Sequence, residues 1–175
     1  MSDELYDGMF DGIMKSFLAQ LNSSLKISKI ISEHSGEEEL SEDSIICGMI
    51  YRLMTPMEDG DVKESMDIAD DIYNKMLYGD SESETESDSG SGSDEESIVP
   101  KELSLRKVKT NNCNCEICIQ ARVCLINYKD HEPKDNLEMI YKNAIDSACK
   151  KGKLYISNPA LTNSYAFLTK LSAIT

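Results

Sequence analysis

Apolar residues recur at steps of three and four along the first part of the chain, which is the period of one helix face. This spacing predicts an amphipathic helix over residues 3–22 and a second helical segment that ends near residues 35–36. Ser41 is expected to cap a further helix, which Pro56 ends, and the next helix is expected over residues 61–79. The pattern therefore predicts an N-terminal bundle of three or four helices.

Charge and periodicity add two details to this bundle. The run Glu37-Glu38-Glu39 is expected as the solvated start of a helix, because carboxylates are favoured near the positive end of the helix dipole. The buried face of the helix over 61–79 is expected to consist of Val62, Met66, Ala69, Ile72, Tyr73 and Met76. The carboxylates on the opposite face then form a solvated surface rather than a catalytic pair.

A helical hairpin is predicted in the second half of the chain. Its first helix is expected over residues 116–129, and Pro133 lies in the turn. Asp135 and Glu138 have the spacing of a capping box, which begins a second helix. Gly152 is expected to end that helix in a left-handed conformation.

Short extended segments are expected on both sides of the hairpin. Polar and apolar residues alternate around Leu105 and Val108, which predicts a strand or an extended arm. Residues 153–156 have a strand-like composition and could pair with this arm. A last helix is predicted after Asn158 and Pro159. The fold class expected is therefore mainly α, with a small C-terminal α(+β) domain that contains the Cys-rich hairpin.

The charge of the chain is divided unevenly around a low-complexity segment. Residues 1–80 carry 18 acidic and 6 basic side chains, whereas residues 98–175 carry 7 acidic and 12 basic ones. Between them lies a serine-rich acidic stretch, which cannot bury enough apolar surface to offset chain entropy. We therefore expect an acidic helical domain at 1–79, a disordered linker at 80–100 and a Cys-rich, zinc-binding domain at 101–175.

Several hydroxyl residues of the linker have an acidic residue three positions later, a pattern favoured by acid-directed kinases. The phosphorylation candidates are Ser81, Ser83, Thr85, Ser91 and Ser93. Each phosphate would add about −1.5 to −2 units of charge to a segment that is already acidic.

The sequence also bounds the class of protein. At 175 residues it is long enough for one core or two small ones, and it has no apolar run near eighteen residues, so no membrane contact is expected. No secretory signal is apparent, and six cysteines without one predict reduced thiols in an intracellular compartment. No phosphate-binding loop, dinucleotide fingerprint or nucleophile elbow is present, which predicts that the protein is not an enzyme.

Five of the six cysteines lie in the hairpin, in the pattern C-x-C-x-x-C followed by two more distant cysteines. If the chain turns near residue 132, antiparallel pairing brings Cys149 back to Cys115. Cys124 lies about 120° around the helix from Cys118, so it is expected in the apolar seam instead. The predicted metal ligands are Cys113, Cys115, Cys118 and Cys149.

Zinc is the expected ion, because four thiolates match a closed tetrahedral structural site. The alternative is a hairpin with free thiols and no metal. A thioredoxin-like redox pair is not favoured, because no βαβ pattern precedes the cysteines. His131 lies at the far end of the predicted hairpin and is expected to be an exposed loop residue.

Two functions remain open from the sequence. The first is a non-enzymatic interaction or accessory protein with an unidentified protein partner, with a homo-oligomer also left open. The second is a nucleic-acid-associated factor for transcription or genome packaging, which uses basic residues on both sides of the cysteines. The candidates for this nucleic-acid-binding surface are Arg106, Lys107, Lys109, Lys150, Lys151 and Lys153.

The amino-acid sequence of the predicted hairpin resembles one group of known proteins. The C-x-C-x-x-C motif, the turn from Glu132 to Asp135 and the helix from Leu137 to Ile145 resemble short uncharacterised proteins of nucleocytoplasmic large DNA viruses. The resemblance covers about 35 residues and implies an intracellular viral accessory or virion-associated protein, located in the host cytoplasm or in the virion.

Overall fold

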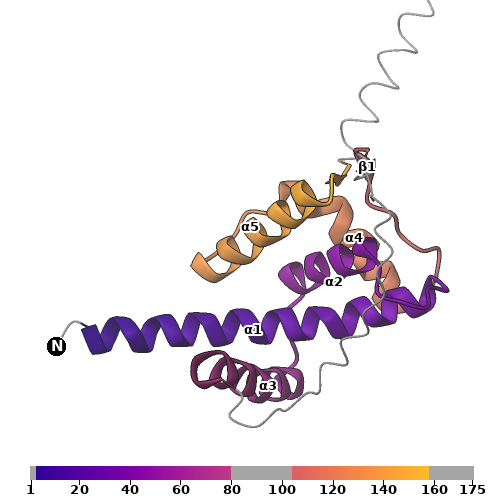
Figure 1. Cartoon of the computed structure of the whole chain (residues 1–175). Coiled ribbons are helices and arrows are strands. Elements are labelled where there is room, and N and C mark those ends of the chain that lie inside the picture. The colour runs from indigo at the N-terminus through magenta and orange to yellow at the C-terminus, as the bar shows by residue number, and fades with distance from the viewer. Residues whose placement is uncertain (1–2, 80–103, 158–175) are drawn as a thin grey trace, which may run out of the picture.

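The computed structural model describes residues 3–79 and 104–157, and its chain path is shown in Figure 1. Within these residues it contains five α-helices, one 3-10 helix and two short strands. In chain order they are α1 (Asp3–His34), α2 (Glu42–Met54), α3 (Asp59–Tyr78), β1 (Arg106–Lys107), α4 (Glu116–Asn127), η1 (Tyr128–Asp130), α5 (Asn136–Lys151) and β2 (Leu154–Tyr155). The prediction of a mainly α fold with a small β contribution is confirmed.

The first helix is longer than the sequence pattern predicted. Residues 3–22 and the segment after them form one uninterrupted helix, α1, that crosses the whole molecule (Figure 1). Its end was predicted correctly: Gly36 adopts a φ of 71°, and the Glu37 N–H donates to the Ser32 carbonyl. A left-handed glycine with this hydrogen bond is the usual way to stop a helix.

Small residues allow α1 and α2 to approach closely. Ser24 and Ser28 of α1 are fully buried, and each hydroxyl donates to a carbonyl of the preceding turn of its own helix. Gly48 of α2 lies against them: a Cβ atom there would be 2.1 Å from Ser28 Oγ and 2.6 Å from the Ser24 carbonyl oxygen. Only glycine fits at this crossing, because the obstacle includes backbone.

Helix α3 packs on the side of α1 opposite to α2 (Figure 1). It runs antiparallel to α1, and polar contacts mark the register: Tyr73 donates to Asp11 at 2.5 Å, and Lys15 pairs with Asp70 at 2.7 Å. The predicted buried face is only partly right. Ala69 and Tyr73 are buried with Ser65, whereas the side chains of Val62, Ile72 and Met76 are exposed. The buried stripe includes a serine, so the periodicity of the apolar residues alone placed the buried face at the wrong position around the helix.

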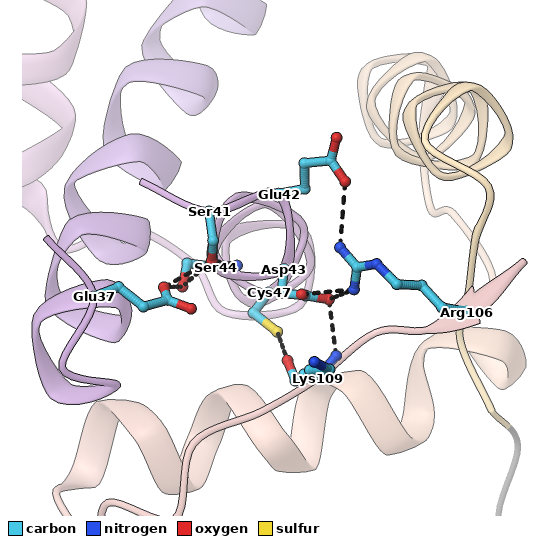
Figure 2. A network of polar contacts seen from close by, with 8 residues as sticks. All are labelled: Glu37, Ser41, Glu42, Asp43, Ser44, Cys47, Arg106 and Lys109. Atoms are coloured by element: carbon cyan, nitrogen blue, oxygen red, sulfur yellow. Dashed lines mark hydrogen bonds and ion pairs between the residues drawn. The ribbon is translucent and has the colours of Figure 1, made fainter. Parts of the chain in front are cut away.

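The turn between α1 and α2 differs from the prediction for the acidic run. Residues 37–39 are not helical. Instead, the Glu37 carboxylate accepts hydrogen bonds from the hydroxyls of Ser41 and Ser44 (Figure 2). It also accepts one from the hydroxyl of Ser32. These bonds, Ser41 first, lower the pKa of Glu37. Ser41 is the N-cap of α2, as predicted, and its oxygen accepts from the Ser44 N–H.

The C-terminal half contains the two predicted helices, and Asp135 caps α5 by accepting from the Glu138 N–H. Both α4 and α5 pack mainly against α2, not against each other. Gly152 is not left-handed, since its φ is −76°; the residue with positive φ is Lys153, at 51°. The prediction of a left-handed Gly152 is therefore wrong by one position.

The extended arm pairs with the segment after α5, as predicted. Strands β1 and β2 are parallel, with Arg106 opposite Leu154 and Lys107 opposite Tyr155. Backbone bonds flank the paired residues: Arg106 N–H donates to the Lys153 carbonyl and Val108 N–H to the Tyr155 carbonyl, both at 3.0 Å. Val108, which follows β1, is buried in the core.

One hydrophobic cluster includes residues from both halves of the chain. Ile50 and Leu53 of α2 belong to it together with Leu125 of α4 and Ile145 of α5. The two sides of the acidic stretch thus share a core, while the boundary at 80–100 stays a prediction. The linker, its phosphorylation candidates and the last helix lie outside the described residues. Within the described residues, no helix is long and apolar enough to cross a membrane.

Candidate metal centre

Four side chains that can bind a metal ion converge at the end of α1 and the start of α4. They are His34, Cys113, Cys115 and Cys118, and their donor atoms all lie within 4.8 Å of one another. His34 is the last residue of α1, whereas Cys115 and Cys118 belong to the first turn of α4 and its cap. The group therefore joins the N-terminal half of the chain to the C-terminal half.

The spacing of the donors suits one tetrahedral ion. The His34 Nδ1 atom lies 3.2 Å from Cys115 Sγ, 3.5 Å from Cys118 Sγ and 3.6 Å from Cys113 Sγ. Zinc bound at about 2.3 Å to sulfur and about 2.0 Å to nitrogen would place a histidine nitrogen and a thiolate about 3.6 Å apart. The group can hold a metal ion with little movement of its side chains.

The local sequence explains why the three cysteines face one point. Cys115 is the N-cap of α4, and its sulfur accepts the Cys118 N–H at 3.4 Å. The Cys115 N–H in turn donates to Cys113 Sγ at 3.4 Å. These bonds fold the C-x-C-x-x-C segment so that its backbone N–H groups point toward its own sulfur atoms. They also satisfy N–H groups that a helix start leaves free.

Asn111 and Arg122 fix this loop from outside. Asn111 donates to the Ile31 carbonyl at 3.1 Å and to Cys118 Sγ at 3.2 Å, and its own oxygen accepts the Cys113 N–H. Arg122 donates to the carbonyls of Asn111 and Cys113 at 2.9 and 2.8 Å. Such outer contacts orient metal ligands.

The thiols of the group differ in acidity. The hydrogen bond from the Cys118 backbone, followed by contacts to Cys118, Cys113 and His34, lowers the pKa of Cys115 to about 7. Burial raises the pKa of Cys118 to about 11. A metal ion binds cysteine as the thiolate. Cys115 is therefore close to this form at neutral pH, whereas Cys118 reaches it only when the metal displaces its proton.

Three of the four predicted ligands are brought together, and Cys149 is not among them. Cys149 is buried in the hydrophobic cluster, where burial raises the pKa of its thiol. The predicted register assumed that the two helices of the hairpin pack on each other. Because α2 packs against both of them, the C-terminal end of α5 does not return to the first turn of α4. Cys124 lies in the apolar core, as predicted, with its sulfur 3.7 Å from Thr55 Oγ1.

The two histidines have roles that the sequence did not indicate. His34 was not predicted as a ligand, because 79 residues separate it from Cys113. The signal available was weak: a histidine directly before the Ser35-Gly36 helix stop, in a chain with only one other histidine. His131, expected to be exposed, has a side chain only 13% exposed and lies 3.6 Å from the Glu138 carboxylate.

The predicted basic residues divide into two kinds. Arg106 pairs with Asp43 at 2.7 Å and with Glu42 at 3.3 Å, and the Lys109 N–H donates to Asp43 (Figure 2). The lysine side chains of the set remain exposed on β1, at the end of α5 and in the segments that follow. Part of the basic surface is thus already neutralised by the acidic start of α2.

Comparisons with protein-family models, curated proteins and solved structures found no match. The function must therefore be argued from the geometry of the chain itself.

Proposed function

We propose that this chain is a non-enzymatic interaction protein whose fold is closed by a structural zinc ion. The ligands are His34, Cys113, Cys115 and Cys118, in a Cys₃His set. The observation that carries the proposal is the convergence of these four donors from two segments that are far apart in sequence. Reduced thiols of this kind fit an intracellular compartment, and the viral origin implied by the resemblance stays a prediction.

The donor set supports a structural rather than a catalytic ion. Catalytic zinc sites keep three protein ligands and one position for water, whereas structural sites have four protein ligands, most often with several cysteines. Here all four positions have a protein donor. The ion would fix the end of α1 to the start of α4, where the direct backbone contacts between the two segments are few.

An exposed apolar stripe on α4 supports an interaction role. Ile119, Val123 and Ile126 follow each other at helical spacing, and their exposed fractions are 45%, 42% and 48%. Helix α4 begins at the metal centre, so a bound ion would fix the position of this stripe. Contiguous exposed apolar side chains are typical of surfaces that bind other proteins.

Cobalt substitution tests whether the site is closed. Full-length protein loaded with Co²⁺ is expected to show thiolate charge-transfer bands and intense visible bands of a tetrahedral ion. Added azide should leave the visible bands unchanged, because no coordination position is open. The variant His34→Ala, which opens one position and binds the ion more weakly, is the matched control; when saturated with excess Co²⁺, it should respond to azide. A wild-type response to azide would indicate an open, catalytic type of site and would overturn the structural role.

A nucleic-acid-associated function is the second candidate, and the β1–β2 pairing favours it. This pairing places Arg106 and Lys107 beside Lys153 and the end of α5, so two of the predicted basic segments are neighbours. Binding of the full chain to DNA should fall steeply with salt, and replacing Lys150, Lys151 and Lys153 with Gln should flatten the slope by up to about 3. The same change at Lys63 and Lys75 of α3 is the control. No binding at low salt removes this candidate.

A further inference from the structure

A buried arginine near the end of α2 has no acidic partner among the residues that the structure describes. Arg52 is only 7% exposed. One of its terminal nitrogens donates to the Thr55 carbonyl at 3.2 Å, and its guanidinium lies 5.7 Å from the centre of the Tyr51 ring. The Nε–H group is buried without a hydrogen-bond partner, and none of the ion pairs formed within residues 3–79 and 104–157 includes Arg52.

This arrangement is unfavourable if nothing else binds there. Burying a charge costs a large free energy unless the charge is paired and hydrogen-bonded. One carbonyl and one aromatic ring satisfy only part of a guanidinium, which has five N–H donors in a planar fork. Arginine cannot lose its proton to relieve the cost. The geometry therefore calls for an anion.

Arg52 lines a cavity that can hold one. The cavity has a volume of about 370 Å³ and lies between α1, the end of α2, the start of α3 and the start of α5. Its size is within the range of small-molecule sites. It is separate from the metal centre, because it contains none of the four donors of that group.

The walls of the cavity indicate the shape of the ligand. Leu53, Met54, Met57 and Val62 supply apolar surface to the cavity that Arg52 also lines. Among the described residues, the side-chain oxygen of Gln20, which also lines the cavity, is buried without a hydrogen-bond partner. A primary amide can offer either its oxygen or its nitrogen to a ligand. We propose that this cavity binds a small organic anion, with a carboxylate held by Arg52 and a short apolar body against the α2–α3 wall.

Two other charged residues at the cavity set its selectivity. Lys134 adds a positive charge at the rim. Glu138 adds a negative one, but its carboxylate accepts the Lys134 N–H at 2.8 Å and lies 3.6 Å from His131, so it does not pair with Arg52. Glu138 thus opposes the anion by charge, and its removal should strengthen binding.

Nitrogen NMR of the arginine side chains tests the site directly. The sequence contains three arginines, Arg52, Arg106 and Arg122, so three Nε–H signals are expected from the full-length protein. Sodium butyrate, added at constant ionic strength, should move the Arg52 signal saturably and leave the other two unchanged. Butyramide, which has the same body without the charge, should move none of them. A stationary Arg52 signal, or equal movement with butyramide, would overturn the proposal.

Variants separate this site from general effects of salt. Arg52→Gln should abolish the saturable response of backbone amides around the cavity, while Arg106→Gln, the same change at an arginine paired with Asp43, should keep it. Glu138→Gln should tighten butyrate binding severalfold and still cap α5, because Gln serves equally at this position of a capping box. If Arg52→Gln does not fold, the Glu138→Gln result decides: unchanged or weaker binding would place the anion elsewhere and overturn the site.

Discussion

The His34 Nδ1 atom lies 3.2 Å from Cys115 Sγ, although 81 residues separate the two in the sequence. His34 ends α1, and Cys115 caps α4. A metal ion held between them would connect the longest helix of the N-terminal half to the first helix of the C-terminal half. The stability of the shared core should therefore depend on the ion.

Removal of the metal should lower the melting temperature. With free zinc at 100 times its dissociation constant, binding stabilises a folded protein by about 2.7 kcal/mol, which corresponds to about 5–10 °C for a chain of this size. Circular dichroism melts with chelator, and after zinc is added back, measure the change. Identical melting temperatures in both conditions would show that the cysteines do not bind a stabilising ion.

Alkylation of thiols should distinguish the clustered cysteines from the core cysteines. In metal-free protein at neutral pH, Cys115 should react with iodoacetamide first, because its pKa is lowered to about 7 and thiolate is the reactive form. Cys47 should resist, since burial raises the pKa of its thiol to about 12. Zinc should protect Cys115 and leave the slow rate of Cys149 unchanged, as mass spectrometry of the digested protein would show. Protection of Cys149 by zinc, with Cys115 left reactive, would restore the ligand set first predicted.

The close crossing of α1 and α2 should not tolerate a larger residue. Gly48→Ala places a Cβ atom against Ser28 Oγ and the Ser24 carbonyl, so it should destabilise the protein by about 1–3 kcal/mol in urea unfolding. Gly12→Ala is the matched control, because nothing lies within 4 Å of a Cβ atom there. It should stabilise α1 by about 0.5–1 kcal/mol. Similar effects of both changes would contradict the packing described.

The two halves of the chain should stay together after the acidic stretch is cut. A specific protease site inserted within residues 80–97 allows a single cleavage there. Because Ile50 and Leu125 share one hydrophobic cluster, the fragments should co-elute in gel filtration without denaturant. Urea should separate them. Separate elution in native buffer would favour two independent domains.

Local patterns in the sequence were sufficient for most of the secondary structure. Ser41 and Asp135 cap helices because their side chains reach N–H groups only three residues away. The pairing of β1 with β2 also followed from composition, although its parallel direction did not. Two errors came from packing: α1 continues where a break was predicted, and the buried face of α3 includes Ser65 in place of Val62. Both features depend on contacts with another helix, and the periodicity of a single segment carries no information about such contacts.

The metal centre was predictable only in its local part. Cys113, Cys115 and Cys118 are close in sequence, so backbone geometry alone brings them together. The fourth position depends on tertiary structure. Cys149 was predicted from a hairpin whose two helices pack on each other. In the structure α2 packs against both of these helices, and the long helix α1 brings His34 to the cysteines instead. No spacing rule connects a histidine at the end of one helix to cysteines beyond a charged linker.

The ligand set is the central claim, and zinc content measured by native mass spectrometry tests it most directly. Wild-type protein is expected to carry one zinc ion per chain. His34→Ala should lose the ion or bind it far more weakly, because loss of a ligand opens a tetrahedral site. Cys149→Ser and His131→Ala should keep one ion each. Retention of zinc by His34→Ala together with its loss from Cys149→Ser would contradict the account.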